Sequence, residues 1–238
     1  MQHGVENCQV KVDPPAWGRT PGFLQGEVSL SLHTGQAQRL VSGRKAQHGK
    51  AAIMGLLGFA GRVRIIDDQA RRDNPFADWW LLKLHKQIVE SIELLESRRL
   101  ELSTFMEKQP LSVHTAQSRE PLLVPLRFRS AYAFFAAEMV AKYDELACLL
   151  LSASHAARIE RSICETLLVK GARTVRRAFY IVQGYRDDLM ITRTQCRQDN
   201  PLYREVSNAM GHLPEAVKLR KLRAPFAPGI GIDQDNGL

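Results

Sequence analysis

The chain has 238 residues, 45% of them hydrophobic and 24% charged, which is the composition of a globular protein with an apolar core. Its formal net charge of +8 and pI of about 9.5 favour a polyanionic partner or a membrane surface, although a basic surface with neither would account for the charge equally well. No uncharged apolar run approaches the roughly 18–20 residues of a membrane span, so we expect no transmembrane helix.

The cysteines and the first residues indicate a cytoplasmic protein. Cys8, Cys148, Cys164 and Cys196 form no C-x-x-C pair, and two of them fall in apolar helical patterns. We therefore expect buried free thiols in a reducing compartment. The start of the chain contains no apolar segment of the kind that a signal peptide requires.

The N-terminal part predicts an arm followed by a strand. Residues 1–24 contain several prolines and glycines and little periodicity, which predicts a mobile arm. From Glu27 to His33 apolar and polar residues alternate, which is typical of a half-buried strand.

Two helices should follow this strand. Thr34 is a suitable N-cap for a helix over residues 35–42, and Gly43 suits its C-terminal end. Apolar residues at steps of three and four predict a second helix from Lys50 to about Arg72. Glycines at 55, 58 and 61 within it indicate either a close approach by another backbone or a broken helix.

The longest predicted element runs from Pro75 to Glu107. Leucine or isoleucine recurs every seven residues in it, which suits either a long hairpin arm or a helix in a bundle. The adjacent Trp79 and Trp80 point about 100° apart on a helix, so one of them could lie at a contact surface instead of the edge of the core.

The rest of the chain predicts one more strand and several helices. Residues 121–129 contain two prolines and suit an edge strand. It could pair with the first strand, or the first strand could pair with its own copy in a dimer. Helices are predicted over 131–151, 154–170, 172–182 and 201–210, with a break at Gly171. No internal repeat is evident.

These elements predict a mainly α protein with a short β element. We expect a helical bundle with a long helical hairpin, whose N-terminal part could resemble a ribbon-helix-helix protein. The predicted divisions are an arm over 1–24, a mainly helical domain over 25–212 with a strand–helix–helix part at 25–72, and an extended basic, proline-rich tail over 213–238.

A basic loop lies between the first two helices. The segment 35–66 contains no Asp or Glu, and its basic residues are Arg39, Arg44, Lys45, Lys50, Arg62 and Arg64. The loop does not match a P-loop, because five residues separate Gly43 from Gly49 and Ala51 replaces the required Ser or Thr. We expect free N–H groups at the start of the second helix to hold a phosphate of nucleic acid together with Arg44 and Lys45. A solvated charged loop is the alternative.

Two further basic clusters support a nucleic-acid partner. The first forms one stripe on a predicted helix, and its members are Lys170, Arg173, Arg176 and Arg177. The second precedes the proline-rich end, and its members are Lys218, Arg220, Lys221 and Arg223.

Enzymatic chemistry has little support in the sequence. The histidines are scattered, and no His or Cys spacing suits a metal site. Asp67, Asp68, Asp73 and Asp78 could bind a divalent metal, but such groups more often cap helices or pair with arginines. No acid, base and orienting group can be placed together, so we predict no enzyme, no catalytic residue, no metal and no cofactor.

The order of strand, helix, glycine turn and helix resembles the outline of ribbon-helix-helix DNA-binding proteins. In these proteins two subunits pair their strands, and the polar face of the ribbon enters the major groove. That arrangement would aim Ser29, Ser31 and His33 at base edges. Glu27 and the long connection between the two helices argue against it.

Several short segments resemble a family of bacterial integrating conjugative element proteins. They are SLSLHT at 29–34, RLVSGR at 39–44, GLLGFA at 55–60, DNPFADWWLL at 73–82, VPLRF at 124–128, QGYR at 183–186 and RAPFAP at 223–228. The resemblance covers nearly the whole chain, but it implies no site residues. A more distant resemblance, to plasmid-borne regulators of conjugative transfer, concerns about the first seventy residues.

We therefore predict a non-enzymatic DNA-binding accessory or regulatory protein of a conjugative element, acting as a homodimer on duplex DNA. The residues expected at DNA are Ser29, Ser31, His33, Arg39, Arg44, Lys45, Lys50, Arg173, Arg176 and Arg177. The rival prediction is a scaffold that binds other proteins of the element through the long helix and its two tryptophans.

Overall fold

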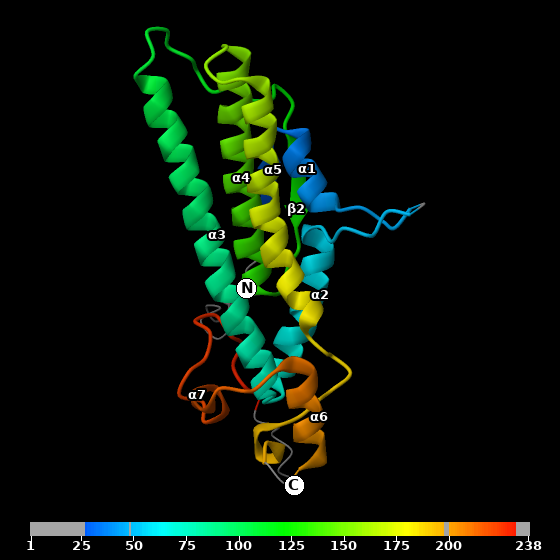
Figure 1. Ribbon diagram of the computed structural model, residues 1–238. Helices are drawn as coiled ribbons and strands as arrows, with labels where there is room; N and C mark the ends of the chain where they lie inside the picture. Colours follow the sequence, from blue (N-terminus) through cyan, green and yellow to red (C-terminus); the bar gives the residue numbers. More distant parts are fainter. Residues whose placement is uncertain (1–26, 48, 198–199, 232–238) are drawn as a thin grey trace, which may run out of the picture.

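The computed structural model describes residues 27–47, 49–197 and 200–231. The predicted arm over 1–24 lies outside these residues. The chain forms a helical bundle with one small antiparallel sheet, as Figure 1 shows, so the predicted fold class is confirmed. Among the described helices, none is both long enough and apolar enough to cross a membrane.

The sheet consists of β1 (Val28–Leu32) and β2 (Leu122–Leu126), which run antiparallel. Leu30 lies opposite Val124 at the centre of the register. In β1 apolar and polar residues alternate, and the buried Leu30 and Leu32 turn one face towards the helices. β2 is apolar throughout, and of its residues Leu126 is buried whereas Leu122 and Leu123 are exposed. The first strand thus pairs within its own chain, and the dimeric ribbon of the ribbon-helix-helix outline is not formed by this edge.

Helix α1 (Gly35–Ser42) begins and ends where its capping residues predict. The Thr34 side chain accepts a hydrogen bond from the Ala37 N–H, and Gly43 has a φ of 65°. The buried Asp144 carboxylate accepts from the His33 N–H at 2.6 Å, the Thr34 N–H at 3.0 Å and the Thr34 hydroxyl at 2.5 Å. Asp144 therefore fixes the end of β1 and the start of α1 against the bundle.

Helix α2 (Leu56–Arg71) begins six residues later than predicted. The residues before it form a hairpin instead, in which Arg44 and Ile53 exchange backbone hydrogen bonds of 2.8 Å. A Cβ on Gly55 would lie 2.4 Å from the Gly43 nitrogen, so only glycine permits the two ends of the hairpin to cross. The predicted helix start at Lys50 is therefore wrong, and residues 49–51 belong to the hairpin instead of a helix N-terminus.

The predicted helical hairpin consists of α3 (Pro75–Glu107) and α4 (Ala131–His155), which pack against each other. Asn74 caps α3 by accepting from the Phe76 N–H at 2.9 Å. Figure 1 shows that α3 leans away from α4 towards its C-terminal end. Trp80 is buried and donates to the Ile181 carbonyl at 3.1 Å, which assigns it to the core.

Helix α5 (Arg161–Ile181) is continuous, so the predicted break at Gly171 is wrong. A Cβ at this position would lie 2.9 Å from the Tyr143 ring. The glycine permits α4 and α5 to approach closely, while the Tyr143 hydroxyl donates to the Leu168 carbonyl at 3.1 Å. The helical hydrogen bonds outweigh the low helix propensity of one glycine.

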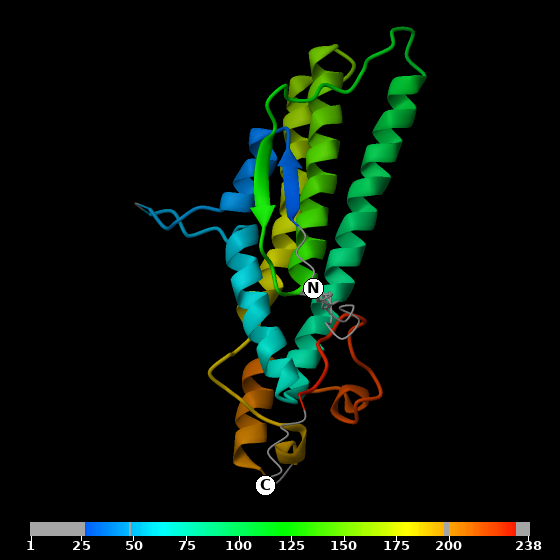
Figure 2. The ribbon, with the colours of Figure 1, turned by 180° about the vertical axis from the view of Figure 1, so that it is seen from behind.

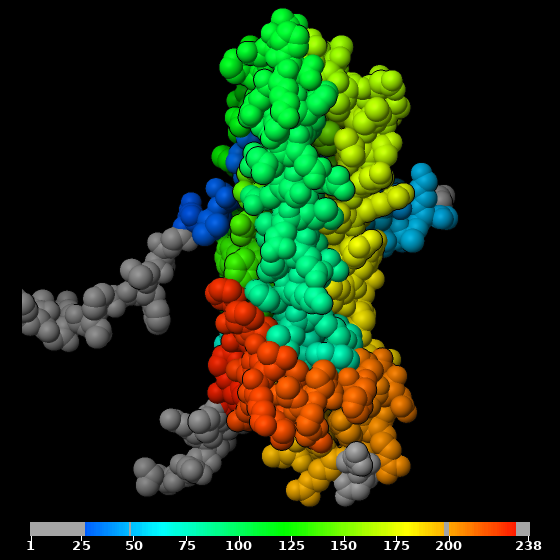
Figure 3. Space-filling view, turned by 60° about the vertical axis from the view of Figure 1, so that its left-hand side comes forward, coloured from blue at the N-terminus to red at the C-terminus, as the bar shows by residue number. Residues whose placement is uncertain are grey.

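The C-terminal residues pack around the base of α3, as Figure 3 shows. They form two single-turn 3-10 helices, η1 (Val182–Gly184) and η2 (Arg193–Gln195), and two α-helices, α6 (Pro201–Met210) and α7 (Glu215–Lys218). The fully buried Asp78 pairs with Arg193 and with Arg223, and the partly buried Asp73 pairs with Arg193 and Arg220. These ion pairs attach η2 and the segment after α7 to the start of α3.

Candidate nucleic-acid interface

The basic hairpin, residues 43–55, projects away from the bundle between α1 and α2 (Figures 1 and 2). Its cations Arg44, Lys45 and Lys50 are exposed, and among the described residues none of them pairs with an acidic side chain. Arg44 also donates to the Ala51 carbonyl at 3.0 Å, which closes the hairpin across its width. The hairpin therefore offers to solvent three positive charges that form no ion pair within the described part of the chain.

The second basic surface, called the α5 face here, consists of Arg39 on α1 and of Lys170, Arg173, Arg176 and Arg177 on α5. Arg39 and Arg176 both lower the pKa of the buried Tyr143, whose burial raises it to about 12. They therefore lie close to the same tyrosine, where α1 packs on α5. No residue of the α5 face forms an ion pair within the described part of the chain. In Figure 3 the hairpin stands out beyond α5 on the same side of the molecule.

Several predicted basic residues are instead paired with carboxylates of the fold. Arg62 pairs with Asp187 at 3.1 Å, and Arg64 lies 3.9 Å from Asp68. In the C-terminal cluster, Arg220 and Arg223 pair with the aspartates at the start of α3. This cluster therefore contributes less free positive charge than its sequence suggests.

The third surface is the outer face of the sheet, called the sheet face here. Ser29 and Ser31 are exposed on it. The residues just after β2, Arg127 and Arg129, are also exposed, and among the described residues neither forms an ion pair. Neither arginine is among the residues expected at DNA from the sequence.

No internal repeat was expected, but two short segments follow the same pattern, and this short repeat could have identified the two arginines. Residues 28–34 read VSLSLHT and residues 124–130 read VPLRFRS, so each has apolar residues at alternate positions and then a helix-capping Thr or Ser. Both segments are a strand that leads into a helix, β1 into α1 and β2 into α4, and the two helices pack together. In this repeat Ser31 corresponds to Arg127 and His33 to Arg129.

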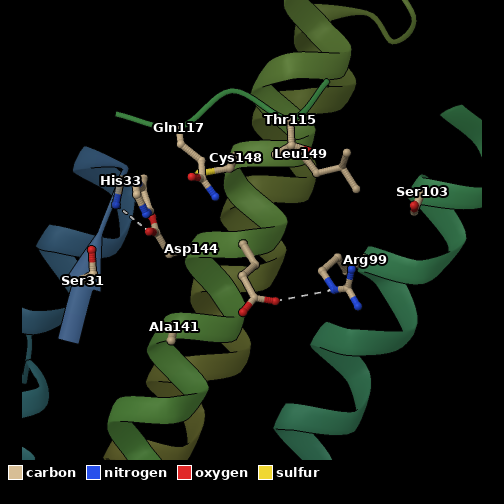
Figure 4. Close-up of a pocket in the computed structure, with 11 residues that line it drawn as sticks. Ser31, His33, Arg99, Ser103, Thr115, Gln117, Ala141, Asp144, Cys148 and Leu149 are labelled. Atoms are coloured by element: carbon tan, nitrogen blue, oxygen red, sulfur yellow. Dashed lines mark hydrogen bonds and ion pairs between the residues drawn. The ribbon is translucent and has the colours of Figure 1, made fainter. Parts of the chain in front are cut away.

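His33 is half-buried, unlike the two exposed serines on its strand, and together with Ser31 it lines a groove beside α4 (Figure 4). Asp144 and Cys148 line the same groove, which has a volume of about 390 Å³. Burial raises the pKa of the Cys148 thiol to about 11, and Asp144 is occupied by the start of α1. Cys148 therefore lacks the ionised thiol that a cysteine nucleophile requires, and the three residues do not form a nucleophilic site.

The structure brings some of the predicted site residues together and separates others. Arg39 and the cations of α5 share one face, and the hairpin projects beside it. The sheet that carries Ser29 and Ser31 lies on the opposite side of the bundle, as the two views in Figures 1 and 2 show. A single flat surface does not contain all the predicted residues.

The carboxylates between α2 and α3 are used in the fold. Asp73 and Asp78 bind arginines, and Asp67 is buried where α2 packs on α4. Within the described residues, no group of three or more His, Cys, Asp or Glu side chains could hold a metal ion.

Comparison with known families assigns the chain to a family of regulatory proteins. Residues 20–231 match the family described as "Transcriptional regulator AcaB". The chain belongs to the AcaB family of transcriptional regulators. The match spans every described helix and both strands, so the hairpin, the α5 face and the sheet face are all parts of the AcaB-family fold. No curated protein and no solved structure matches the chain.

Proposed function

We propose that this AcaB-family protein regulates transcription by binding duplex DNA, with the basic hairpin in contact with phosphates. The observation that carries the proposal is the hairpin itself, which projects from the body with Arg44, Lys45 and Lys50 exposed and unpaired among the described residues. Each lysine or arginine that neutralises a phosphate releases a counterion, which gives affinity for DNA of any sequence.

The sheet face would supply the sequence preference. A two-stranded antiparallel ribbon fits the major groove of B-DNA, and serine and arginine side chains can contact base edges there. Ser29, Ser31, Arg127 and Arg129 are the exposed polar residues in or next to the two strands that suit this role. We place the protein in the regulation of a conjugative element, in keeping with the sequence resemblance.

The expected homodimer cannot form through the edge of β1 that β2 already occupies. If the protein is instead a scaffold, the surface that best suits a protein partner is a groove of about 490 Å³ between α3 and α5. Apolar residues such as Leu94 and Phe105 line this groove. The tryptophans are less available, because Trp80 is buried and the Lys83 ammonium lies 3.3 Å from the centre of the Trp79 ring.

Fluorescence anisotropy with labelled duplexes tests the proposal at about 50 mM salt. The triple variant Arg44→Ala/Lys45→Ala/Lys50→Ala should bind every duplex more weakly. The matched control is Lys86→Ala/Arg98→Ala/Arg186→Ala, which removes the same charge from exposed residues that already pair with acids. Equal affinities of the two variants would remove the hairpin from the interface.

A second variant separates base contact from phosphate contact. Ser31→Ala removes one hydroxyl from the sheet face without changing the net charge. We expect it to alter the preference among duplex sequences and to leave the affinity for non-specific DNA unchanged. A scaffold protein would bind no duplex under these conditions, whereas Leu94→Glu would release its protein partner.

A further inference from the structure

We infer that one chain binds two separate duplex segments, one on the sheet face and one on the α5 face, and so bridges DNA. This inference rests on the proposed function, because it assigns a duplex to each of two surfaces of a DNA-binding protein. The inference goes beyond the proposed function, because regulation at one promoter site needs only one of the two surfaces.

Both surfaces carry exposed cations, but they do not lie on the same side of the molecule. The sheet face carries Arg127 and Arg129, and the α5 face carries Lys170, Arg173 and Arg177, all of them exposed. In the described residues none of these cations has an acidic partner. On the sheet face the exposed Glu27 precedes β1, opposite the end of β2 that leads into Arg127, so two arginines stand against one carboxylate there. Both surfaces therefore carry more cations than carboxylates among these residues and can attract phosphates independently.

The bundle itself separates the patches. The sheet packs on α4, and α5 packs on α4 and α1, so helices lie between the two patches. Figure 1 shows α5 in front, and Figure 2, turned by 180°, shows the sheet in front. Each helix layer is about 10 Å thick, so the two patches face away from each other across the body.

A single duplex cannot contact both patches. Its direction would have to reverse around a body only a few helix diameters wide, whereas duplex DNA is stiff over about 150 base pairs. Two duplexes, or two distant parts of one long duplex, satisfy both patches without such bending. The hairpin projects at the side of the body, where it can reach the phosphates of either segment.

A capture assay tests the inference. A biotinylated duplex on beads is mixed with the full-length protein and a fluorescent duplex at about 50 mM salt. The stoichiometry of duplex per chain is measured in parallel by sedimentation. We expect the wild-type protein to retain the fluorescent duplex and to bind two duplexes per chain.

Two variants locate the two sites. Arg127→Ala/Arg129→Ala and Arg173→Ala/Arg177→Ala should each still bind duplex, at one per chain, and each should lose capture of the fluorescent duplex. The control Lys86→Ala/Arg186→Ala removes equal charge from exposed residues that pair with acids and belong to neither face, and it should capture normally.

The outcomes separate this inference from the proposed function. A stoichiometry of one duplex per wild-type chain, or full capture by either single-face variant, overturns bridging and leaves DNA binding intact. The second of these results would mean that self-association of one face joins the duplexes. If the wild-type protein binds no single duplex, the proposed function fails as well.

Discussion

Asp67 should make the stability of the fold depend on pH in the weakly acidic range. Its side chain is 7% exposed and lies where α2 packs on α4. Burial raises the pKa of this carboxyl from 3.8 to about 6, against the smaller opposing effects of Ser130 and Arg71. The folded protein therefore holds a proton on Asp67 at pH values where the unfolded chain has released it.

The sign and size of the effect follow from linkage. Because the pKa is higher in the folded state, the stabilisation is complete below pH 3.8 and is lost as the pH rises through about 6. The whole shift corresponds to about 3 kcal/mol, and the part lost between about pH 5 and 7.5 is about 1.4 kcal/mol. Asp67→Asn cannot ionise and should not show this loss.

Urea unfolding at the two pH values measures the difference. The free energy of unfolding of the wild-type protein should fall between about pH 5 and 7.5 by about 1.4 kcal/mol more than that of Asp67→Asn. Asp68→Asn is the matched control, because it removes an exposed carboxylate one residue away, and it should follow the wild-type protein. If Asp67→Asn and the wild-type protein have the same pH dependence, the carboxyl is not held neutral by burial.

Two further substitutions test the packing. Asp78→Ala leaves the largely buried Arg223 without a carboxylate partner and Arg193 with Asp73 alone, so it should lower the free energy of unfolding by about 3–5 kcal/mol. The exposed Arg220→Ala should cost at most about 1 kcal/mol. Gly171→Ala should destabilise the protein by about 1–3 kcal/mol, because its Cβ meets the Tyr143 ring at 2.9 Å. Gly61→Ala has open space and should stabilise α2 by about 0.8–1 kcal/mol. Thermal or urea unfolding measures all four variants. Equal changes in stability for Asp78→Ala and Arg220→Ala, or for Gly171→Ala and Gly61→Ala, would refute these expectations.

Local sequence signals predicted the helix boundaries that depend on local contacts. Thr34 and Gly43 delimit α1, and Asn74 followed by Pro75 starts α3, because each acts on backbone groups only a few residues away. The same kind of reasoning placed the start of α2 too early. There the decisive contact joins Gly43 to Gly55, across a hairpin that helical periodicity does not indicate.

The features that the sequence did not predict depend on partners far along the chain. Arg223 looked like a free cation, but it meets Asp78, which lies 145 residues earlier. The pairing of β1 with β2 joins segments that are nearly a hundred residues apart, and both possible partners suited the alternation equally well. For the candidate site, the basic residues were visible in the sequence, whereas their division between two sides of the bundle was not.

The central claim is that the hairpin neutralises DNA phosphates, and the salt dependence of duplex affinity tests it most directly. The logarithm of the association constant should fall linearly with the logarithm of salt concentration, by about 0.9 for each phosphate neutralised. We predict that Arg44→Ala/Lys45→Ala/Lys50→Ala reduces this slope by up to about 2.7, while Lys86→Ala/Arg98→Ala/Arg186→Ala leaves it unchanged. Identical slopes for the wild-type protein and the hairpin variant would contradict the claim.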